Sequence, residues 1–527
     1  MATDLQSGLQ VGARRVASVN PATEEVLREL ECARDVDVQV AVSRAHAAQA
    51  AWAEMSVGKR VGILRDFQRL LHERKTEVAR LITREAGKPY VEALLTEVMV
   101  VLDAARYVIE NAHPFLRDEP LPHGGIAMKT KRGVLVREPR GVIGIIAPWN
   151  YPFSIPATET LAALATGNAV VLKPSEFTSL VALELESLLH AAGVPKLIFQ
   201  VLVGDGATGA ALMGSAIDKL VFTGSVTTGK RIAQAAAGRL LPVLLELGGK
   251  DPMIVLEDAD LDVASSGAVW GAFVNAGQAC LSVERCYVAR GIYEEFLKAC
   301  VAKVAKLRVG DGIHETTDVG PMIHERQLQI VEEQVEDARR RGARVLAGGR
   351  RMTELGANFY APTVVADVTS EMELMQEETF GPVLAVAAFS GDEEAVALAN
   401  DSEFGLAASV WTRDSARGER IARRLVAGTV MVNDVIACFG IREAPHGGVK
   451  GSGIGRAHGR FGMEEMVRVK YLDVERAAGI KRVWWYGYGE KFARQMEGFA
   501  DLQFARGVWG RVLGALRAAG VVKGAKL

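Results

Sequence analysis

Cysteine is scarce in this 527-residue sequence, and its five cysteines do not fall into a pairing pattern. Cys32, Cys280, Cys286, Cys300 and Cys438 are too few and too widely spaced for a disulfide framework, and they form no paired CxxC zinc motif. We therefore expect reduced thiols and no metal site, with a free thiol available for chemistry.

Net charge and long apolar runs are lacking as well. The formal net charge of −2 gives no reason to expect a nucleic-acid partner. No run approaches the roughly 20 apolar residues of a spanning helix, and the polar N-terminus has no apolar secretory core. These absences predict a cytoplasmic protein, with peripheral contact to a membrane left open.

What is present is an ordinary globular balance, with 49% hydrophobic and 24% charged residues. A chain of this length usually forms two or three domains. Residues 35–111 carry apolar side chains at helical spacing, and Asp35 is placed to cap the first helix. Residues 129–146 change to an extended pattern punctuated by glycine and proline.

Short β-rich runs then alternate with helical stretches. The β-rich runs are residues 169–172, 199–203 and 220–222, and the helical stretches are 178–192, 206–216 and 228–238. Such alternation predicts a parallel sheet with helices on both faces. A second alternating region covers residues 252–433, so we expect two α/β units joined near residue 247 with a ligand cleft between them.

Two glycine-rich loops each allow two interpretations. The first loop, Gly204-Asp-Gly206-Ala-Thr-Gly209, matches either a dinucleotide-binding fingerprint or a plain turn that leads into a helix. The acidic residue that a dinucleotide-binding fingerprint requires about 20 residues downstream is not evident. Gly224-Ser-Val-Thr-Thr-Gly229 is close to a phosphate-binding P-loop, but Arg231 stands where that loop needs Ser or Thr for magnesium. This argues against nucleotide hydrolysis and leaves either a helix N-terminus that faces a phosphate or a tight turn.

Three residues could serve as nucleophile, base and oxyanion donor in a reaction at a carbonyl group. Cys280 follows a glycine-containing loop and could be a nucleophile, although a lone cysteine is usually a buried apolar residue. Glu246 ends an apolar run, where partial burial would suit a general base, or it is a surface glutamate. Asn150, held between prolines, could donate to an oxyanion or stabilise a turn.

Seven motifs in order resemble the aldehyde dehydrogenase superfamily over residues 15–475. They are Pro148-Trp-Asn-Tyr-Pro-Phe153, Lys173-Pro-Ser-Glu176, Phe222-Thr-Gly-Ser225, Glu246-Leu-Gly-Gly-Lys250, Gly277-Gln-Ala-Cys280, Glu378-Thr-Phe-Gly-Pro382 and Gly447-Gly-Val-Lys-Gly-Ser-Gly453. The resemblance implies an α/β fold with a Rossmann-like cofactor domain, an α/β catalytic domain and a β-hairpin oligomerisation arm. It assigns residues 1–128 and 142–246 to the cofactor domain, 247–440 to the catalytic domain, 129–141 and 463–478 to the arm, and 479–527 to a basic extension.

The resemblance also implies site roles. Cys280 would be the nucleophile, Asn150 the oxyanion donor and Glu246 the base that activates the deacylating water. The cofactor would be bound by Trp149, Lys173, Glu176, Gly224, Ser225, Gly229, Gln327, Glu378 and Phe380. The substrate pocket would be lined by Tyr151, Phe153, Ile155, Thr158, Leu281 and Phe439.

The implied reaction is oxidation of an aldehyde to an acid through a thiohemiacetal and a thioester. Glu176 should favour NAD over NADP, because a carboxylate repels a 2′-phosphate, while Lys173 leaves weaker use of NADP open. Glu246 argues for hydrolysis rather than transfer to coenzyme A. An apolar pocket favours medium-chain aliphatic or aromatic aldehydes. The alternatives are a succinic-semialdehyde-type or coenzyme A-acylating semialdehyde dehydrogenase and, more remotely, a catalytically silent scaffold.

Several positions depart from the family pattern. His446 stands where relatives commonly have Phe, and it could face the substrate or pack against the glycine turn. Thr158 stands where semialdehyde-oxidising relatives often carry an arginine, although Arg442 could substitute. Residues 479–527 hold nine Lys or Arg, three Asp or Glu and three tryptophans, which predicts either a helix on a membrane surface or a cap over a partner subunit or the substrate entrance. We expect a homodimer or homotetramer that binds a small aldehyde and no nucleic acid.

Overall fold

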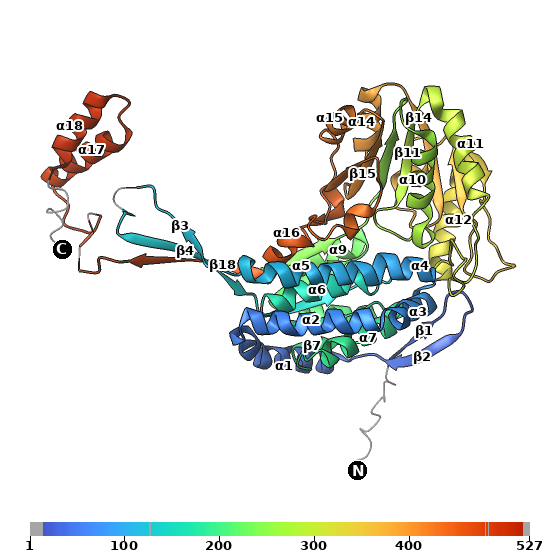
Figure 1. The fold of residues 1–527 in the computed structure, drawn as a ribbon, viewed down its shortest axis with the longest axis horizontal. Coiled ribbons are helices and arrows are strands. Elements are labelled where there is room, and N and C mark those ends of the chain that lie inside the picture. Colours follow the sequence, from blue (N-terminus) through green and yellow to red (C-terminus); the bar gives the residue numbers. More distant parts are fainter. Residues whose placement is uncertain (1–13, 126–127, 480, 483, 520–527) are drawn as a thin grey trace, which may run out of the picture. The chain divides into compact units, whose positions relative to one another are not determined.

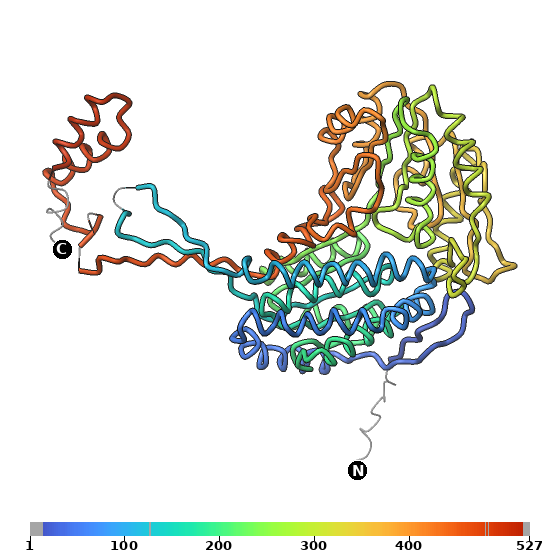
Figure 2. The backbone as a smooth tube through the Cα atoms, viewed as in Figure 1, coloured from blue at the N-terminus to red at the C-terminus, as the bar shows by residue number. Residues whose placement is uncertain are grey.

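A computed structural model describes residues 14–125, 128–479, 481–482 and 484–519, which are drawn as a ribbon in Figure 1 and as a backbone tube in Figure 2. The chain divides into two compact units. The first unit contains residues up to 117 together with 137–468, and the second contains 118–136 together with 469–527.

The first unit contains a six-stranded sheet that carries the predicted cofactor motifs. In spatial order its strands are β17 (Gly453–Ile454), β9 (Val243–Glu246), β8 (Lys219–Thr223), β5 (Val142–Ile146), β6 (Ala169–Lys173) and β7 (Phe199–Val201). All neighbours pair in parallel except β17, which runs antiparallel to β9.

The order of these strands reverses direction at one point. The chain makes β5, β6 and β7 outward on one side and then returns to place β8 and β9 on the other side of β5. This is the doubly wound arrangement, in which ligands bind at the carboxyl ends of the strands next to the reversal. The parallel sheet and its strand positions, predicted from the alternation of β-rich and helical runs, are confirmed.

Helices cover both faces of this sheet, and α2, α5 and α6 pack side by side along it (Figure 1). The helices of this half are α1 (Asp35–Glu54), α2 (Val57–Glu73), α3 (Lys75–Ala86), α4 (Tyr90–Ala93), α5 (Met99–Phe115), α6 (Ser154–Ala165), α7 (Ser179–Ala191), α8 (Gly206–Gly214) and α9 (Val226–Ala237). A π-helical segment, Leu94–Val98, joins α4 to α5, and a short hairpin of β1 (Arg15–Val19) and β2 (Val26–Glu31) precedes α1. The expected cap at Asp35 is wrong by one residue: Arg34 is the N-cap, and Asp35 lies in the first turn, where an acidic side chain favours the helix dipole.

A second, seven-stranded sheet forms the other half of the unit. Its strands lie in the order β12 (Arg344–Ala347), β13 (Thr363–Ala366), β14 (Val383–Phe389), β11 (Val283–Ala289), β10 (Asp251–Val255), β15 (Ala407–Trp411) and β16 (Thr429–Val432). Only the edge strand β12 pairs antiparallel. The accompanying helices are α10 (Leu261–Phe273), α11 (Tyr293–Val304), α12 (Glu325–Arg340), α13 (Glu373–Gln376), α14 (Asp392–Asn400) and α15 (Ser415–Ala422).

After β16 the chain returns to the first sheet. Short 3-10 segments (Ala437–Gly440 and Lys450–Ser452) lead to β17 and to α16 (Gly459–Glu465). Met463, Met466 and Val467 are buried in the core of the first sheet. The expected arm boundary at residue 463 therefore differs from the structure, because residues 463–466 pack as part of the cofactor half.

The second unit consists of a three-stranded sheet and a helical hairpin. The sheet has the order β18 (Val467–Glu475), β4 (Lys131–Pro139), β3 (Glu119–Leu121), so the two segments with the extended pattern do pair as strands. An ion pair between Lys131 and Asp473 joins β4 to β18. The hairpin is formed by α17 (Glu490–Phe504) and α18 (Val508–Ala518). None of the helices in the described residues is both long and apolar enough to span a bilayer.

Candidate active site

The carboxyl edge of the six-stranded sheet gathers the sequence motifs at one place. Asn150 follows β5, Lys173 ends β6, Ser225 follows β8 and Glu246 ends β9. Because β5 and β8 flank the reversal in strand order, this edge is where a doubly wound sheet binds its ligand.

A cavity of about 270 Å³ opens at this edge, and we call it the polar cavity because several polar side chains form part of its wall. The predicted site residues that line it are Trp149, Asn150, Gly224, Ser225, Glu246, Cys280, Gln327, Glu378 and Phe380. The structure thus brings together side chains from both sheets that are up to 231 residues apart in sequence, from Trp149 to Phe380. Lys173, Glu176 and Gly229 are not among the described residues that line it.

A second cavity, of about 320 Å³, is almost entirely apolar. Of the predicted substrate residues, Tyr151, Ile155, Leu281 and Phe439 line it. Cys280 lines both cavities, so its thiol lies where the polar and the apolar space meet. A thiol in this position can react with a carbonyl carbon that enters from the apolar side.

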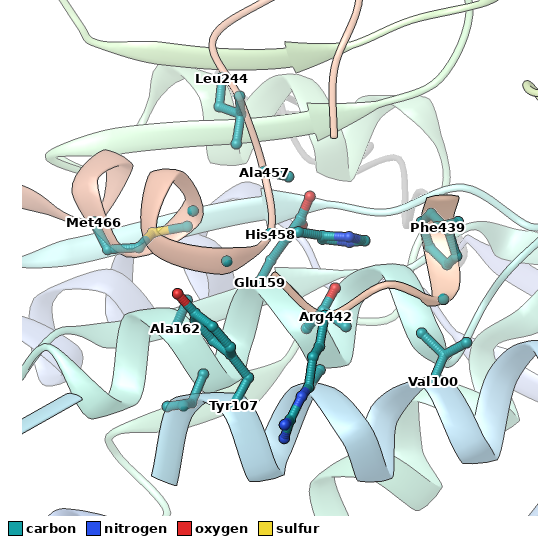
Figure 3. A pocket seen from close by; sticks show the side chains of 16 residues that line it. Val100, Tyr107, Glu159, Ala162, Leu244, Phe439, Arg442, Ala457, His458 and Met466 are labelled. Atoms are coloured by element: carbon teal, nitrogen blue, oxygen red, sulfur yellow. The ribbon is translucent and has the colours of Figure 1, made fainter. Parts of the chain in front are cut away.

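Two predicted pocket residues lie elsewhere. Phe153, the N-cap residue of α6, is fully buried in the core of the first sheet. Thr158 lines a different, small cavity beside Glu159 and Arg442, shown in Figure 3. Arg442, considered as a substitute cation for a semialdehyde carboxylate, pairs with Glu110 and Glu443 and does not line the apolar cavity.

The turn before Cys280 is held in a strained conformation. Asn275, Ala276 and Gly277 have φ values of 54°, 55° and 72°, in the left-handed region that only glycine adopts at little cost. A Cβ on Gly277 would lie 2.0 Å from the carbonyl oxygen of Gly381. The Asn275 amide donates to the carbonyl of Asn150 at 3.0 Å, so the turn and the oxyanion candidate are fixed to each other.

Burial governs the ionisation of the thiol. It raises the pKa of Cys280 well above the usual value, and the carboxyl groups of Asp251, Glu378 and Glu246 raise it further when they are ionised. A positive charge brought into the polar cavity would act in the opposite direction and favour the thiolate. The other four cysteines are buried, as expected for residues that serve packing.

Asn150 is buried, and its side-chain amide donates to the carbonyl of Gln278 at 3.1 Å. The α6 N-terminus behind it is held by Glu97, which accepts from the backbone N–H groups of Phe153 and Ser154 at 3.1 and 2.7 Å. Lys88 forms a buried ion pair with Glu97 at 2.7 Å. Sequence reasoning missed Glu97 and Lys88, because charged residues in a helical stretch usually mark a solvated face.

Glu246 is only 4% exposed, and neither of its carboxylate oxygens has a hydrogen-bond partner among the described residues. Burial raises its pKa well above the usual glutamate value. A carboxyl group with a raised pKa is suited to take a proton from water near neutral pH.

The N-terminus of α9 meets the polar cavity at Gly224 and Ser225. Ser225 caps this helix by accepting from the N–H of Thr228. Gly229 lies one turn further along, where a Cβ would be 2.5 Å from Leu247, so this glycine is needed for close packing of the helix. The other glycine loop is a plain turn, because Asp205 accepts from the N–H of Ala207 and caps α8 itself.

The opposite wall of the polar cavity is the segment around Glu378 and Phe380. Glu378 accepts from the N–H of Gly249 at 3.0 Å, and burial, with the charge of Glu284, raises its pKa to about 8. The Gln327 amide donates to the carbonyl of Thr379 at 3.1 Å. Phe380 meets the ring of Trp149 edge-on at 5.3 Å.

A buried ion pair between Lys250 and Glu284, 2.5 Å apart, supports this wall from behind. Glu284 also accepts from the N–H groups of Thr379 and Phe380 at 2.8 and 3.0 Å. The sequence motifs included Lys250 without a role and did not include Glu284. In the part of the chain that the structure describes, no cluster of His, Cys, Asp or Glu is arranged to hold a metal ion.

Comparison with known proteins gives one consistent result. A model of the aldehyde dehydrogenase family matches residues 10–472. The chain is 38% identical to a mitochondrial succinate-semialdehyde dehydrogenase from Oryza sativa subsp. japonica, over 86% of this chain and 85% of that one. It is 38% identical to a 4,4'-diapolycopene aldehyde oxidase from Methylomonas sp, over 92% of this chain and 91% of that one.

Among solved structures, an NAD-dependent aldehyde dehydrogenase from Sinorhizobium meliloti superposes with a TM-score of 0.86 at 37% identity. The match covers 90% of this chain and 93% of that one. The match in fold therefore extends over nearly the whole of both chains.

Replacement of Glu284 by Gln tests the support behind the polar cavity. It leaves the Lys250 charge buried without a counter-charge, so we expect a loss of about 3–5 kcal/mol in the free energy of unfolding, measured by urea denaturation. Glu332→Gln is the matched control, because Glu332 pairs with Arg351 in a partly exposed position and should cost less than about 1 kcal/mol. Equal losses in the two variants would contradict the argument.

Proposed function

This chain belongs to the aldehyde dehydrogenase family and is an NAD(P)-dependent enzyme, and we propose that it oxidises apolar aldehydes to carboxylic acids through a thioester on Cys280. The observation that carries the proposal is the position of the Cys280 thiol between an apolar and a polar cavity. The polar cavity fits the cofactor, because a helix N-terminus lies at one wall and Glu378 at the other. The bound nicotinamide supplies the hydride acceptor.

In this proposal each residue has one task. Cys280 attacks the aldehyde carbon as a thiolate, and the Asn150 amide, with the Cys280 N–H, donates to the oxyanion; one such donor is typically worth about 2.7–4 kcal/mol. After oxidation, Glu246 takes a proton from water, whose oxygen attacks the thioester carbon. The C–S bond then breaks, its electron pair stays on Cys280, and the acid leaves.

The apolar cavity supports an uncharged substrate. Its walls include Tyr151, Trp270, Leu281 and Phe439, and no Lys or Arg is among the described residues that line it. A semialdehyde carboxylate would be buried there without a counter-charge, at considerable cost. Medium-chain aliphatic or aromatic aldehydes are therefore proposed. Because one relative is a succinate-semialdehyde dehydrogenase, a semialdehyde remains the alternative substrate, oxidised either by hydrolysis of the thioester or by transfer to coenzyme A. Parallel assays with both aldehyde classes, with and without coenzyme A, distinguish these alternatives.

Assembly into a homodimer or homotetramer is proposed through the three-stranded sheet. β18 is an edge strand, and Val469, Tyr471, Leu472 and Val474 are exposed on it. Exposed apolar side chains on an edge strand are usually covered by a partner chain.

The helical hairpin supports a further proposed contact, with a membrane surface. α17 and α18 approach each other through glycines: a Cβ at Gly498 would lie 2.3 Å from Cβ of Arg517, and one at Gly514 would lie 2.3 Å from the backbone nitrogen of Leu502. The large apolar side chains point away from this contact, and Trp509 is 79% exposed. Leu513 and Leu516 are exposed on the same stripe of α18.

Charge and aromatic content favour a lipid surface over a second copy of the hairpin. Residues 479–527 carry a net charge of +6, from nine basic and three acidic residues. A two-fold contact would bring two such positive surfaces together, whereas anionic lipid headgroups attract them. Trp484, Trp485 and Tyr486 are exposed just before α17, and Trp and Tyr are the residues enriched at membrane interfaces.

Replacement of Glu246 by Gln tests the deacylation step. We expect a first burst of NADH that matches the enzyme concentration, followed by turnover that is about 100-fold slower, measured by stopped-flow absorbance. Cys280→Ser is the control, and it should abolish the burst as well. An equal loss of burst and turnover in the Gln variant would contradict a purely deacylating role.

Replacement of Glu176 by Gln tests the preference for NAD. Glu176 begins a short 3-10 segment and lies 3.5 Å from Lys173. Removing its charge removes the repulsion of a 2′-phosphate, so the ratio of kcat/KM for NADP to that for NAD should rise about tenfold. An unchanged ratio in steady-state assays with both cofactors would count against this role.

Deletion of residues 479–527 tests the membrane contact. Full-length protein should float with phosphatidylcholine vesicles that contain phosphatidylglycerol at 0.1 M salt, and much less at 0.5 M salt. The truncated protein and the double variant Trp509→Ala/Leu513→Ala should remain unbound. If instead the full-length protein does not bind the vesicles, and light scattering shows that the truncated protein has a smaller oligomeric mass, the extension caps a partner subunit.

A further inference from the structure

The surroundings of Glu246 pose a physical difficulty for a base. A base must be ionised before it acts, yet Glu246 is buried and its oxygens have no hydrogen-bond partner among the described residues. An ionised buried carboxylate without a donor is strongly disfavoured. A donor must therefore become available when Glu246 loses its proton.

The imidazole of His446 lies beside this carboxylate. Its Nε2 is 3.7 Å from Oε2 of Glu246, so a shift of the carboxylate by roughly 0.8 Å brings the two atoms to hydrogen-bond distance. The position is rigid, because the backbone of His446 pairs with Ala457 in both directions, at 2.9 and 2.7 Å. His458 stacks on the ring at 5.4 Å, and Phe439 meets it edge-on at 5.3 Å.

The charged neighbours decide which protonation state His446 has. Burial, with the positive charges of His458 and Arg456, lowers the pKa of His446 to about 3, and burial lowers that of His458 to about 4. Both rings are therefore neutral at pH 7, and His446 can offer one N–H. A neutral donor can approach a carboxylate without carrying a second buried charge.

The backbone N–H of Ala457 lowers the pKa of Glu246, but it already donates to the carbonyl of His446 at 2.7 Å. The remaining groups around Glu246 leave the donor role of His446 open. Burial raises the pKa of Glu159 to about 8, so this carboxyl is protonated and uncharged at pH 7. Glu465 is paired with Lys219, and Nη1 of Arg456 donates to the carbonyls of Gly448 and Gly455. Glu159 and His458 line the small cavity of Figure 3, together with Tyr107 and Arg442.

We infer that His446 is a positioning residue for Glu246: its Nε2–H donates to the ionised carboxylate and keeps the base available to the water that hydrolyses the thioester. The inference rests on the proposed role of Glu246. The proton removed from water passes to Glu246 and from there to solvent, while His446 keeps the same number of protons throughout.

Three variants test the inference. In His446→Phe the donor is lost but a buried aromatic ring of similar shape remains, so the variant should fold. His446→Gln keeps an N–H donor. His458→Phe is the matched control, because it removes an imidazole from the same cluster without removing the donor beside Glu246.

The measurement is a single turnover with enzyme in excess, from pH 6 to pH 10. Stopped-flow absorbance follows NADH, and rapid quench follows the acid. His446→Phe should leave the NADH rate within about twofold of wild type. The pKa of the base, already raised by burial, should rise by a further unit, so that acid formation at pH 7 is about tenfold slower and recovers toward pH 10. His446→Gln should restore most of the rate, and His458→Phe should leave the profile in place.

The outcomes separate this inference from the proposed function. If Glu246→Gln abolishes acid formation but His446→Phe leaves the pH profile of acid formation unchanged, the role of His446 is overturned and the proposed role of Glu246 is retained. If His446→Phe slows NADH and acid formation equally at every pH, its role is structural and the inference is again overturned. If Glu246→Gln forms acid at the wild-type rate, the proposed role of Glu246 and the inference fail together.

Discussion

Burial of ionisable side chains is the constraint on which the site depends. Glu246 is buried and Cys280 is partly buried, and this removal from water moves both of their pKa values upward. A buried thiol is a poor nucleophile unless a positive charge lies near it. A buried carboxylate is a poor base unless a hydrogen-bond donor lies near it. In the proposed mechanism, the thiol therefore becomes reactive only when a positive charge enters the polar cavity.

The rest of the first unit serves to hold these two groups in place. The left-handed turn from Asn275 to Gly277 brings Cys280 to the junction of the cavities, and such a turn persists only when its surroundings hold it firmly. Two buried ion pairs support the walls of the site, Lys88 with Glu97 behind Asn150 and Lys250 with Glu284 behind the opposite wall. The carboxylates of Glu97 and Glu284 also accept hydrogen bonds from backbone N–H groups. The two ion pairs therefore hold the main chain in place as well as neutralising charge.

The second unit follows a different logic. In the first unit large apolar side chains fill two cores, whereas the helical hairpin places glycines at the helix contact and exposes Trp509 and Leu516. This inversion is uncommon for a pair of helices in water, because most of the stability of a short helix comes from burying its apolar face. It is the arrangement expected of an element that meets its apolar environment outside its own chain.

The sequence alone determined the strand and helix alternation and was enough to propose Cys280, Glu246 and Asn150 as site residues, because turns, periodicity and motifs are local signals. It could not determine that Phe153 points into the core, nor that Glu97 and Glu284 brace the site. A charged residue on a helix or strand looks the same in sequence whether it faces water or a distant partner. Only tertiary packing brings such residues together, since burial and pairing depend on contacts between segments far apart in the chain.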